Sequence, residues 1–126
     1  MSATSPSQIT AQMISVWRDD ALTGVALAER EDSSGWNLVF ERSRKFTDAD
    51  RKAGQDTYCI TNEAGAAAYG GVTNWAVNGA DLTLSMDAAT SGALGLATEL
   101  TISLGFSASS VADLKTALAE ILSPKG

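Results

Sequence analysis

Few side chains of this sequence could carry chemistry, and their types exclude most catalytic mechanisms. The chain contains no histidine, which removes the usual general base, the usual partner of a nucleophilic serine or cysteine, and the commonest zinc ligand. Its single cysteine, Cys59, could still act as a lone nucleophile. However, Cys59 stands in the alternating stretch TYCIT, where an unpaired cysteine is typical of a small buried hydrophobe. We therefore expect Cys59 to pack in a sheet and to have no chemical role.

Carboxylates, a calcium-like loop and a glycine pair are the remaining candidates for a reactive site. A glycosidase needs two carboxylates facing across a cleft, but fifteen Asp and Glu residues in a chain of 126 form pairs by chance. The segment DADRKAG opens like a calcium loop, yet Lys52 stands where a third oxygen ligand belongs. Gly70 and Gly71 belong to no phosphate-binding motif and precede no predicted helix. The sequence therefore predicts no catalytic, cofactor-binding or metal-binding residues, and no enzyme.

The glycine pair and its aromatic neighbours have structural interpretations. Gly70 and Gly71 are expected to permit a bulge or a close approach of the backbone within a strand pair. Tyr69 and Trp75 could stack on a base or a sugar, but aromatic residues on alternating strands usually belong to the core or to cross-strand pairs. The core is favoured more clearly for Trp75 than for Tyr69. A small-ligand- or carbohydrate-binding β-rich domain that uses these two rings is therefore an alternative function.

The charge balance limits the possible partners. Nine Lys and Arg residues against fifteen Asp and Glu residues give a net charge of −6, which disfavours nucleic acid and anionic membranes and would attract a basic protein. Residues 42–52 carry five basic and two acidic side chains, and we interpret them as a solvated loop and short helix rather than an anion site. The N-terminal segment has no basic region followed by an apolar run, so we expect a cytoplasmic protein.

Alternation of apolar and polar residues dominates the sequence and predicts strands. In ELTISLG, for example, Leu100, Ile102 and Leu104 share one face, as expected of a sheet with one buried face. Asn78-Gly79 and the segment 62–65 are typical of tight hairpin turns. Because such connections are too short to cross between parallel strands, we expect a mainly antiparallel sheet. About seven strands are expected, at 9–17, 22–30, 36–42, 57–62, 68–77, 80–86 and 99–105.

Helices are predicted at three places. The stretch SSVADLKTALAEIL, with Ser110 as N-cap and an apolar face that includes Leu114 and Leu118, predicts a C-terminal amphipathic helix packed on the sheet. Thr47 and Asp87 each precede a candidate short helix. The sequence therefore predicts an α+β fold with one or two short helices besides the C-terminal one.

The chain is short enough to be a single domain. With 126 residues, a second core would leave too little apolar area for either half. Residues 1–8 (MSATSPSQ) are small and polar, which predicts a loosely ordered lead-in. We expect residues 9–126 to form the domain.

Several short motifs occur together in the middle of the chain. DTYCI at 56–60 is followed by an NEAG turn, YGGV at 69–72, Trp75, LTL at 82–84 and ALGL at 93–96. In this combination the chain resembles the tenth immunity-protein family of bacterial polymorphic toxin systems, over roughly residues 10 to 122. The resemblance implies a small cytoplasmic protein of mixed α and β structure, which binds and neutralises a cognate toxin domain.

The resemblance brings no catalytic residues and points to function by stoichiometric complex formation. An acidic protein would attract a basic toxin domain by charge steering. The expected contacts are then acidic residues on or near predicted turns, with a tyrosine as an aromatic anchor. These residues are Asp56, Glu63, Asp81 and Tyr69.

Overall fold

The computed structural model describes residues 7–32, 34–43, 45–53 and 57–122, and this part of the chain forms nine strands and three helices. The strands are β1 (Gln8–Ala11), β2 (Met13–Arg18), β3 (Leu22–Ala28), β4 (Asn37–Ser43), β5 (Cys59–Asn62), β6 (Ala67–Tyr69), β7 (Val72–Asn78), β8 (Asp81–Met86) and β9 (Glu99–Leu104). The helices are α1 (Asp48–Lys52), α2 (Ala88–Leu94) and α3 (Ala108–Ile121). The predicted α+β class is confirmed, with more strands than the seven expected. The domain boundary at residue 9 stays a prediction.

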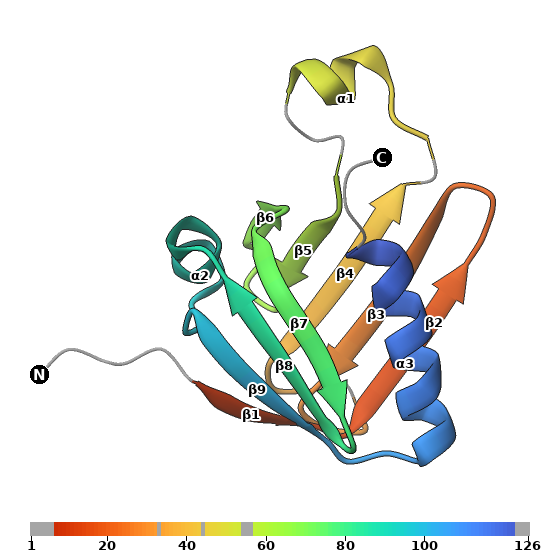
Figure 1. Ribbon diagram of the computed structural model, residues 1–126, viewed down its shortest axis with the longest axis vertical. Helices are drawn as coiled ribbons and strands as arrows, with labels where there is room; N and C mark the ends of the chain where they lie inside the picture. The colour runs from red at the N-terminus through yellow and green to blue at the C-terminus, as the bar shows by residue number, and fades with distance from the viewer. Residues whose placement is uncertain (1–6, 33, 44, 54–56, 123–126) are drawn as a thin grey trace, which may run out of the picture.

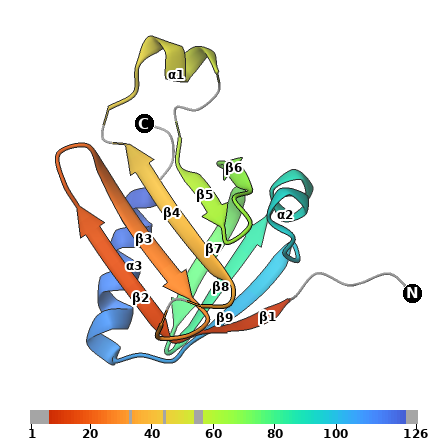
Figure 2. The same ribbon diagram turned by 180° about the vertical axis from the view of Figure 1, so that it is seen from behind.

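The strands are divided between two sheets. One sheet has the order β2-β3-β4-β5-β6 and is antiparallel throughout. The other has the order β1-β9-β8-β7 and is antiparallel except for the parallel pair of β1 and β9. The five-stranded sheet forms one layer, and the four-stranded sheet forms the other together with α3 (Figures 1 and 2). The mainly antiparallel character is therefore confirmed.

Two of the expected strands each turn a corner between the sheets. The expected strand 9–17 divides at Gln12 into β1 and β2, and the expected strand 68–77 divides at Gly70 and Gly71 into β6 and β7. The two halves of each segment therefore pair in different sheets. At the second corner Ala68 and Val72 both pack against the core, so the alternation runs through Gly70 and Gly71 without a break. At the first corner Ala11 and Ile14 both pack against the core, so the inward positions shift by one residue at Gln12.

The core lies between the two layers. Its large, fully buried side chains come from alternate strand positions and from one face of α3, and they are Val25, Leu27, Phe40, Ile60, Leu82, Leu84, Leu100, Ile102, Leu114, Leu118 and Ile121. Since successive residues of a strand point to opposite faces, the residues between these positions on β3, β4 and β5 point away from the core. They form the outer face of the five-stranded sheet, which is turned toward the viewer in Figure 2.

Helix α3 packs against β2, β3 and β4. It begins at Ala108, earlier than the sequence predicted, because Ser107 rather than Ser110 is the N-cap. The Ser107 hydroxyl accepts a hydrogen bond from the Ser110 N–H at 3.2 Å, which satisfies a backbone donor of the first turn. The predicted apolar face is confirmed, since Leu114 and Leu118 are fully buried.

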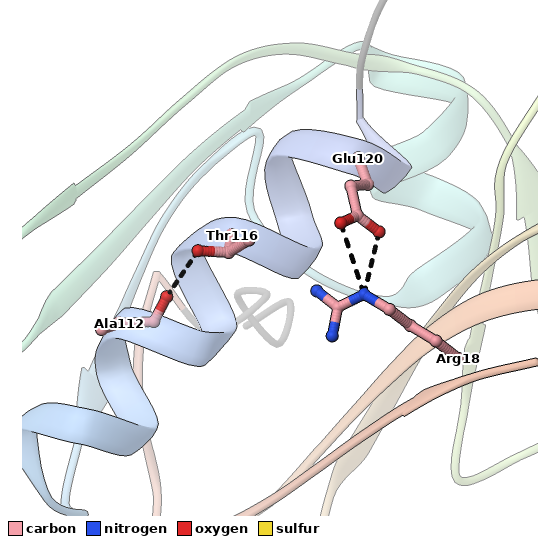
Figure 3. Close-up of polar contacts among 4 residues, drawn as sticks. All are labelled: Arg18, Ala112, Thr116 and Glu120. Carbon is pink, nitrogen blue, oxygen red and sulfur yellow. Dashed lines mark hydrogen bonds and ion pairs between the residues drawn. The ribbon is translucent and has the colours of Figure 1, made fainter.

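Two arginines hold the C-terminal end of α3 on the five-stranded sheet. The Nε–H of Arg18, from the end of β2, donates to Oε2 of Glu120 at 3.1 Å (Figure 3). A guanidinium N–H of Arg42, from β4, donates to the backbone carbonyl of Ile121 at 3.2 Å. A cation at this end also interacts favourably with the helix dipole. These contacts fix the helix over the sheet at the end where β2 and β4 finish.

The capping predictions at Thr47 and Asp87 and the predicted turn at Gly79 are confirmed. Thr47 and Asp50 form a capping box at α1, with hydrogen bonds of 3.0 and 2.8 Å between each side chain and the other residue's backbone N–H. Asp87 caps α2 by accepting from the Thr90 N–H at 2.8 Å. The hairpin between β7 and β8 turns at Gly79, whose φ is 59°.

Candidate partner-binding face

One row of residues crosses all five strands on the outer face of the five-stranded sheet. The register pairs Trp17 with Gly24, Gly24 with Glu41, Glu41 with Cys59, and Cys59 with Tyr69. Directly paired residues point to the same side of a sheet. We call these five residues the outer row. It combines two aromatic rings, a carboxylate and a thiol on one surface.

At one end of the outer row, the Trp17 indole lies over β3. A Cβ atom at Gly24 would overlap Cε2 of Trp17 and would lie 2.6 Å from its Nε1. The ring therefore fills the space where a side chain at Gly24 would stand, and only glycine permits this close approach. Gly24 thus sets the position of the indole on the outer face.

At the other end, the outer row borders a hollow of about 310 Å³. We call it the outer hollow; it is lined by Leu22, Glu41, Ser43, Phe46, Asp50, Thr57, Cys59 and Tyr69. Helix α1, which contributes Asp50, lies beyond the end of β4 (Figure 2). The described lining residues include two carboxylates and no basic side chain. Tyr69 is 48% exposed, so its ring is accessible to a partner.

The two carboxylates of the outer hollow differ in their existing contacts. Asp50 already accepts the Thr47 N–H in the capping box. Within the described residues, the Glu41 carboxylate forms no ion pair and accepts no hydrogen bond. The Phe46 ring is engaged as well, because the Arg42 guanidinium lies 5.9 Å from its centroid. Glu41 is therefore the charged group of the hollow with the most capacity for a new contact.

Cys59 lies between Glu41 and Tyr69 in the outer row and is half-buried. Burial raises the pKa of its thiol, a hydrogen bond with the Tyr69 side chain opposes the rise, and the Glu41 carboxylate adds to it. The thiol is therefore mainly protonated at neutral pH, which makes it a poor nucleophile. Cys59 packs in a strand of the sheet, as expected, but it is half-buried rather than buried, because its side chain is on the outer face.

Behind the outer row, the residues next to Cys59 and Tyr69 build the second corner between the sheets. The Tyr58 hydroxyl is buried in the core side and accepts a hydrogen bond from the Val72 N–H at 2.8 Å. Burial raises the pKa of Tyr58, and this hydrogen bond opposes the rise. Gly71 has a φ of 96°, and a Cβ atom there would overlap Oγ1 of the buried Thr90. Gly71 therefore permits a close backbone approach, as expected, but to Thr90 of α2 rather than within one strand pair.

The predicted contact residues do not gather in one place. Tyr69 lines the outer hollow. Glu63, in the β5–β6 turn, accepts the Asn37 N–H at 3.0 Å, which ties that turn to the start of β4. Asp81 begins β8 in the other sheet, and Asp56 lies outside the described residues. Among the described candidates, Tyr69 is the one that the structure places beside Glu41 and Cys59.

Sequence reasoning missed Glu41 and Trp17 as residues of a shared surface. Part of the signal was present, because alternation that buries Phe40 and Ile60 must turn Glu41 and Cys59 outward. Their direct pairing depends on the register of β4 against β5, and these strands are separated by the segment that carries α1. Local patterns do not specify such a register.

Tyr69 and Trp75 do not share a surface. Tyr69 ends β6 on the outer face of the five-stranded sheet, whereas Trp75 belongs to β7 of the four-stranded sheet and packs against the core. A carbohydrate-binding site built on these two rings needs both of them on one concave face. Their placement therefore disfavours that alternative function.

The outer row carries groups that can contact a partner. Within the described residues, no group of three or more His, Cys, Asp or Glu side chains could hold a metal ion. In the same part of the chain, none of the helices combines the length and the apolarity needed to cross a membrane. The outer row offers two aromatic rings, a thiol that is mainly protonated and a carboxylate with no ion pair among the described residues.

Comparison with known proteins identifies a family. A family model described as Immunity protein 10 matches residues 10–112. This span includes the outer row, the outer hollow and both corners, and it ends in the N-terminal part of α3. Among curated proteins, none matches the chain. The match confirms the resemblance carried by the DTYCI and YGGV motifs, and the chain therefore belongs to the immunity protein 10 family.

Proposed function

We propose that this protein is a cytoplasmic immunity protein that binds a cognate bacterial toxin domain and neutralises it by forming a stoichiometric complex. The observation that carries the proposal is the family match over residues 10–112. The absence of histidine from the chain supports binding rather than enzymatic inactivation of the toxin. The net charge of −6 supports a basic partner, since opposite charges accelerate association.

The outer row and the outer hollow form the proposed contact surface. Tyrosine and tryptophan are frequent anchors of protein interfaces, and Tyr69 is exposed at the rim of a hollow that could receive a partner side chain. Asp56, Glu63 and Asp81 stay predictions as further contacts. A partner that covers the hollow and reaches Asp81 would have to span both sheets, since Asp81 belongs to the four-stranded one.

Co-expression with the candidate toxin tests the proposal. A candidate toxin domain, sought in the genes next to the one for this protein, is expressed in a sensitive cell with and without the protein, and survival is counted. We expect survival only with the protein, together with a purified complex of fixed stoichiometry. Its association rate should fall with added salt, while its dissociation rate changes much less. Equal killing in both cases, with no complex at micromolar concentrations, would refute the immunity function.

Two variants locate the contact surface. Tyr69→Ala should weaken the complex by roughly 10-fold or more if Tyr69 is a central anchor. Asp81→Asn removes the charge of a predicted further contact on the other sheet and should weaken the complex less than Tyr69→Ala does. A loss in Asp81→Asn without a loss in Tyr69→Ala would move the contact surface to the β7–β8 hairpin.

A further inference from the structure

The residues that line the outer hollow indicate which type of toxin side chain it would receive. We propose that this hollow receives an arginine side chain of the toxin domain, whose guanidinium pairs with Glu41 and stacks on the Tyr69 ring. The inference rests on the proposed function, because it names the chemistry of the partner at the same surface. It also assigns Glu41 a binding role that the family match does not give.

Charge complementarity selects a cation. The described residues that line the hollow include Glu41 and Asp50 and no basic side chain, so a phosphate or a carboxylate would meet repulsion there. The Glu41 carboxylate has no ion-pair partner within the described residues. An interface that covered it without supplying a cation would leave a desolvated, unpaired charge, which is costly. A partner that closes over this hollow therefore needs a positive group.

Size and shape select a single side chain. The volume of about 310 Å³ lies at the low end of the roughly 300 to 1,000 Å³ found for small-molecule pockets. Tyr69 offers an aromatic ring at the rim, and its 48% exposure leaves that ring accessible. The same kind of contact already exists beside the hollow, where Arg42 lies 5.9 Å from the Phe46 ring centroid. Phe46 is thus engaged, and Tyr69 is the ring open to a cation from the partner.

Geometry favours arginine over lysine. A guanidinium is planar, stacks on aromatic rings and can donate two parallel hydrogen bonds to one carboxylate, whereas an ammonium is a compact, strongly hydrated charge. Glu41 and Tyr69 are two strands apart and both are paired with Cys59. Because they stand on hydrogen-bonded strands, their spacing is fixed before the partner arrives, which suits a rigid, flat group.

The first experiment measures the affinity of the toxin domain for matched charge variants. Glu41→Gln removes the carboxylate charge with little change of shape, and Asp113→Asn makes the same charge change on α3, in the other layer. We expect Glu41→Gln to weaken binding roughly 10- to 100-fold, and Asp113→Asn to weaken it less than about 2-fold. Equal affinities of the two variants would overturn the inference.

A second variant tests the Tyr69 ring, and thermal unfolding shows whether either variant weakens binding by destabilising the fold. Tyr69→Leu keeps apolar bulk but removes the ring, and it should weaken the complex by roughly 2- to 5-fold through loss of the cation–π contact. The thermal unfolding midpoints of both outer-hollow variants should stay close to that of the wild type. Full affinity in Tyr69→Leu would overturn the stacking part of the inference.

The second experiment needs no toxin. The ¹⁵N-labelled protein is titrated in the millimolar range with N-acetyl-arginine methylamide, and separately with the lysine and glutamate analogues. The arginine probe should cause saturable shifts at Glu41, Cys59 and Tyr69, stronger than those of lysine, and Glu41→Gln should abolish them. Equal or stronger binding of the lysine probe, or arginine shifts that are absent or scattered, would overturn the assignment.

The two experiments separate two failures. If the wild-type protein forms no complex with the toxin domain but binds the arginine probe at the outer row, the proposed function fails and the cation site stands. If the complex forms and Glu41→Gln binds as tightly as Asp113→Asn, the proposed function stands and the arginine assignment fails.

Discussion

The inner and outer sides of the β5–β6 hairpin have different roles, although buried and exposed residues alternate along the same short motif. On the inner side, Tyr58, Ile60 and Ala68 are buried, and the Tyr58 hydroxyl holds the Val72 N–H at the corner between the sheets. On the outer side, the neighbouring Cys59 and Tyr69 are partly exposed and form one end of the outer row. The inner contacts are complete within the chain, whereas the outer ones leave surface for a partner.

This difference separates two functions of one motif. DTYCI and YGGV carry the family resemblance. Within these motifs the buried Tyr58 and the glycines have a structural role, because they form the corner between the two sheets. Tyr69 has no comparable duty in the core, since nearly half of it is exposed. We therefore expect substitutions on the inner side to reduce stability, and substitutions on the outer side to affect binding with little loss of stability.

The largest loss of stability is expected for Gly71→Ala. The new Cβ would overlap Thr90 at a backbone φ of 96°, so a steric clash adds to the strain of a positive φ. We expect the free energy of unfolding to fall by roughly 2 to 6 kcal/mol, measured by denaturant titration. Gly79→Ala is the matched control, because Gly79 also has positive φ but a Cβ there meets no atom within 4 Å. It should cost about 1 to 2 kcal/mol, and equal losses in the two variants would contradict the proposed clash.

A smaller loss is expected for Tyr58→Phe. The substitution keeps the ring in the core but removes the oxygen that accepts the Val72 N–H at 2.8 Å. A backbone donor left without a partner in a partly buried position costs roughly 1 to 3 kcal/mol. Denaturant titration measures this loss, and binding of the toxin domain should be unchanged. Reduced affinity in a folded Tyr58→Phe protein would mean that the corner and the outer row are coupled.

Local features of the fold could be predicted from the sequence, and long-range pairings could not. The caps at Thr47 and Asp87 depend on neighbouring residues and were found. The parallel pairing of β1 with β9 joins Gln8 to Thr101, and no local pattern specifies contacts over such a separation. The corner at Gly70 and Gly71 was hidden for a related reason, since apolar alternation continues from one sheet into the other.

Some residues of the candidate site could likewise be predicted from the sequence, and others could not. The sequence points to Tyr69 because the core is favoured less clearly for this aromatic residue than for Trp75, which leaves its ring as a candidate anchor. The sequence does not point to Glu41, because the position of Glu41 next to Cys59 follows from the register between β4 and β5. Glu63 was chosen for its place in a turn, and there its carboxylate holds the Asn37 N–H. Turn position alone therefore does not distinguish a structural carboxylate from one that is open to a partner.

On the outer side, Cys59→Ser should cost about 1 kcal/mol of stability, because it replaces a half-buried thiol with a more polar hydroxyl. Since burial raises the thiol pKa, the native protein should react with an alkylating reagent more slowly than free cysteine at neutral pH, and faster as the pH rises. Mass spectrometry of the alkylated protein measures the rate. Rapid stoichiometric labelling at neutral pH would contradict a protonated, unreactive thiol.

The smallest loss of stability is expected for Tyr69→Ala. The side chain is 48% exposed and belongs to β6, a three-residue strand at the edge of its sheet. Its removal therefore loses little more than the cross-strand contact with Cys59. Such contacts contribute on the order of 0.5 kcal/mol. The free energy of unfolding should therefore fall by about that amount, while affinity for the toxin domain falls much more. Measured together with Gly71→Ala, two residues away, this variant decides whether the two sides of the motif are independent. A stability loss in Tyr69→Ala as large as that in Gly71→Ala would show that the outer ring supports the fold, and its exposure would then have no bearing on binding.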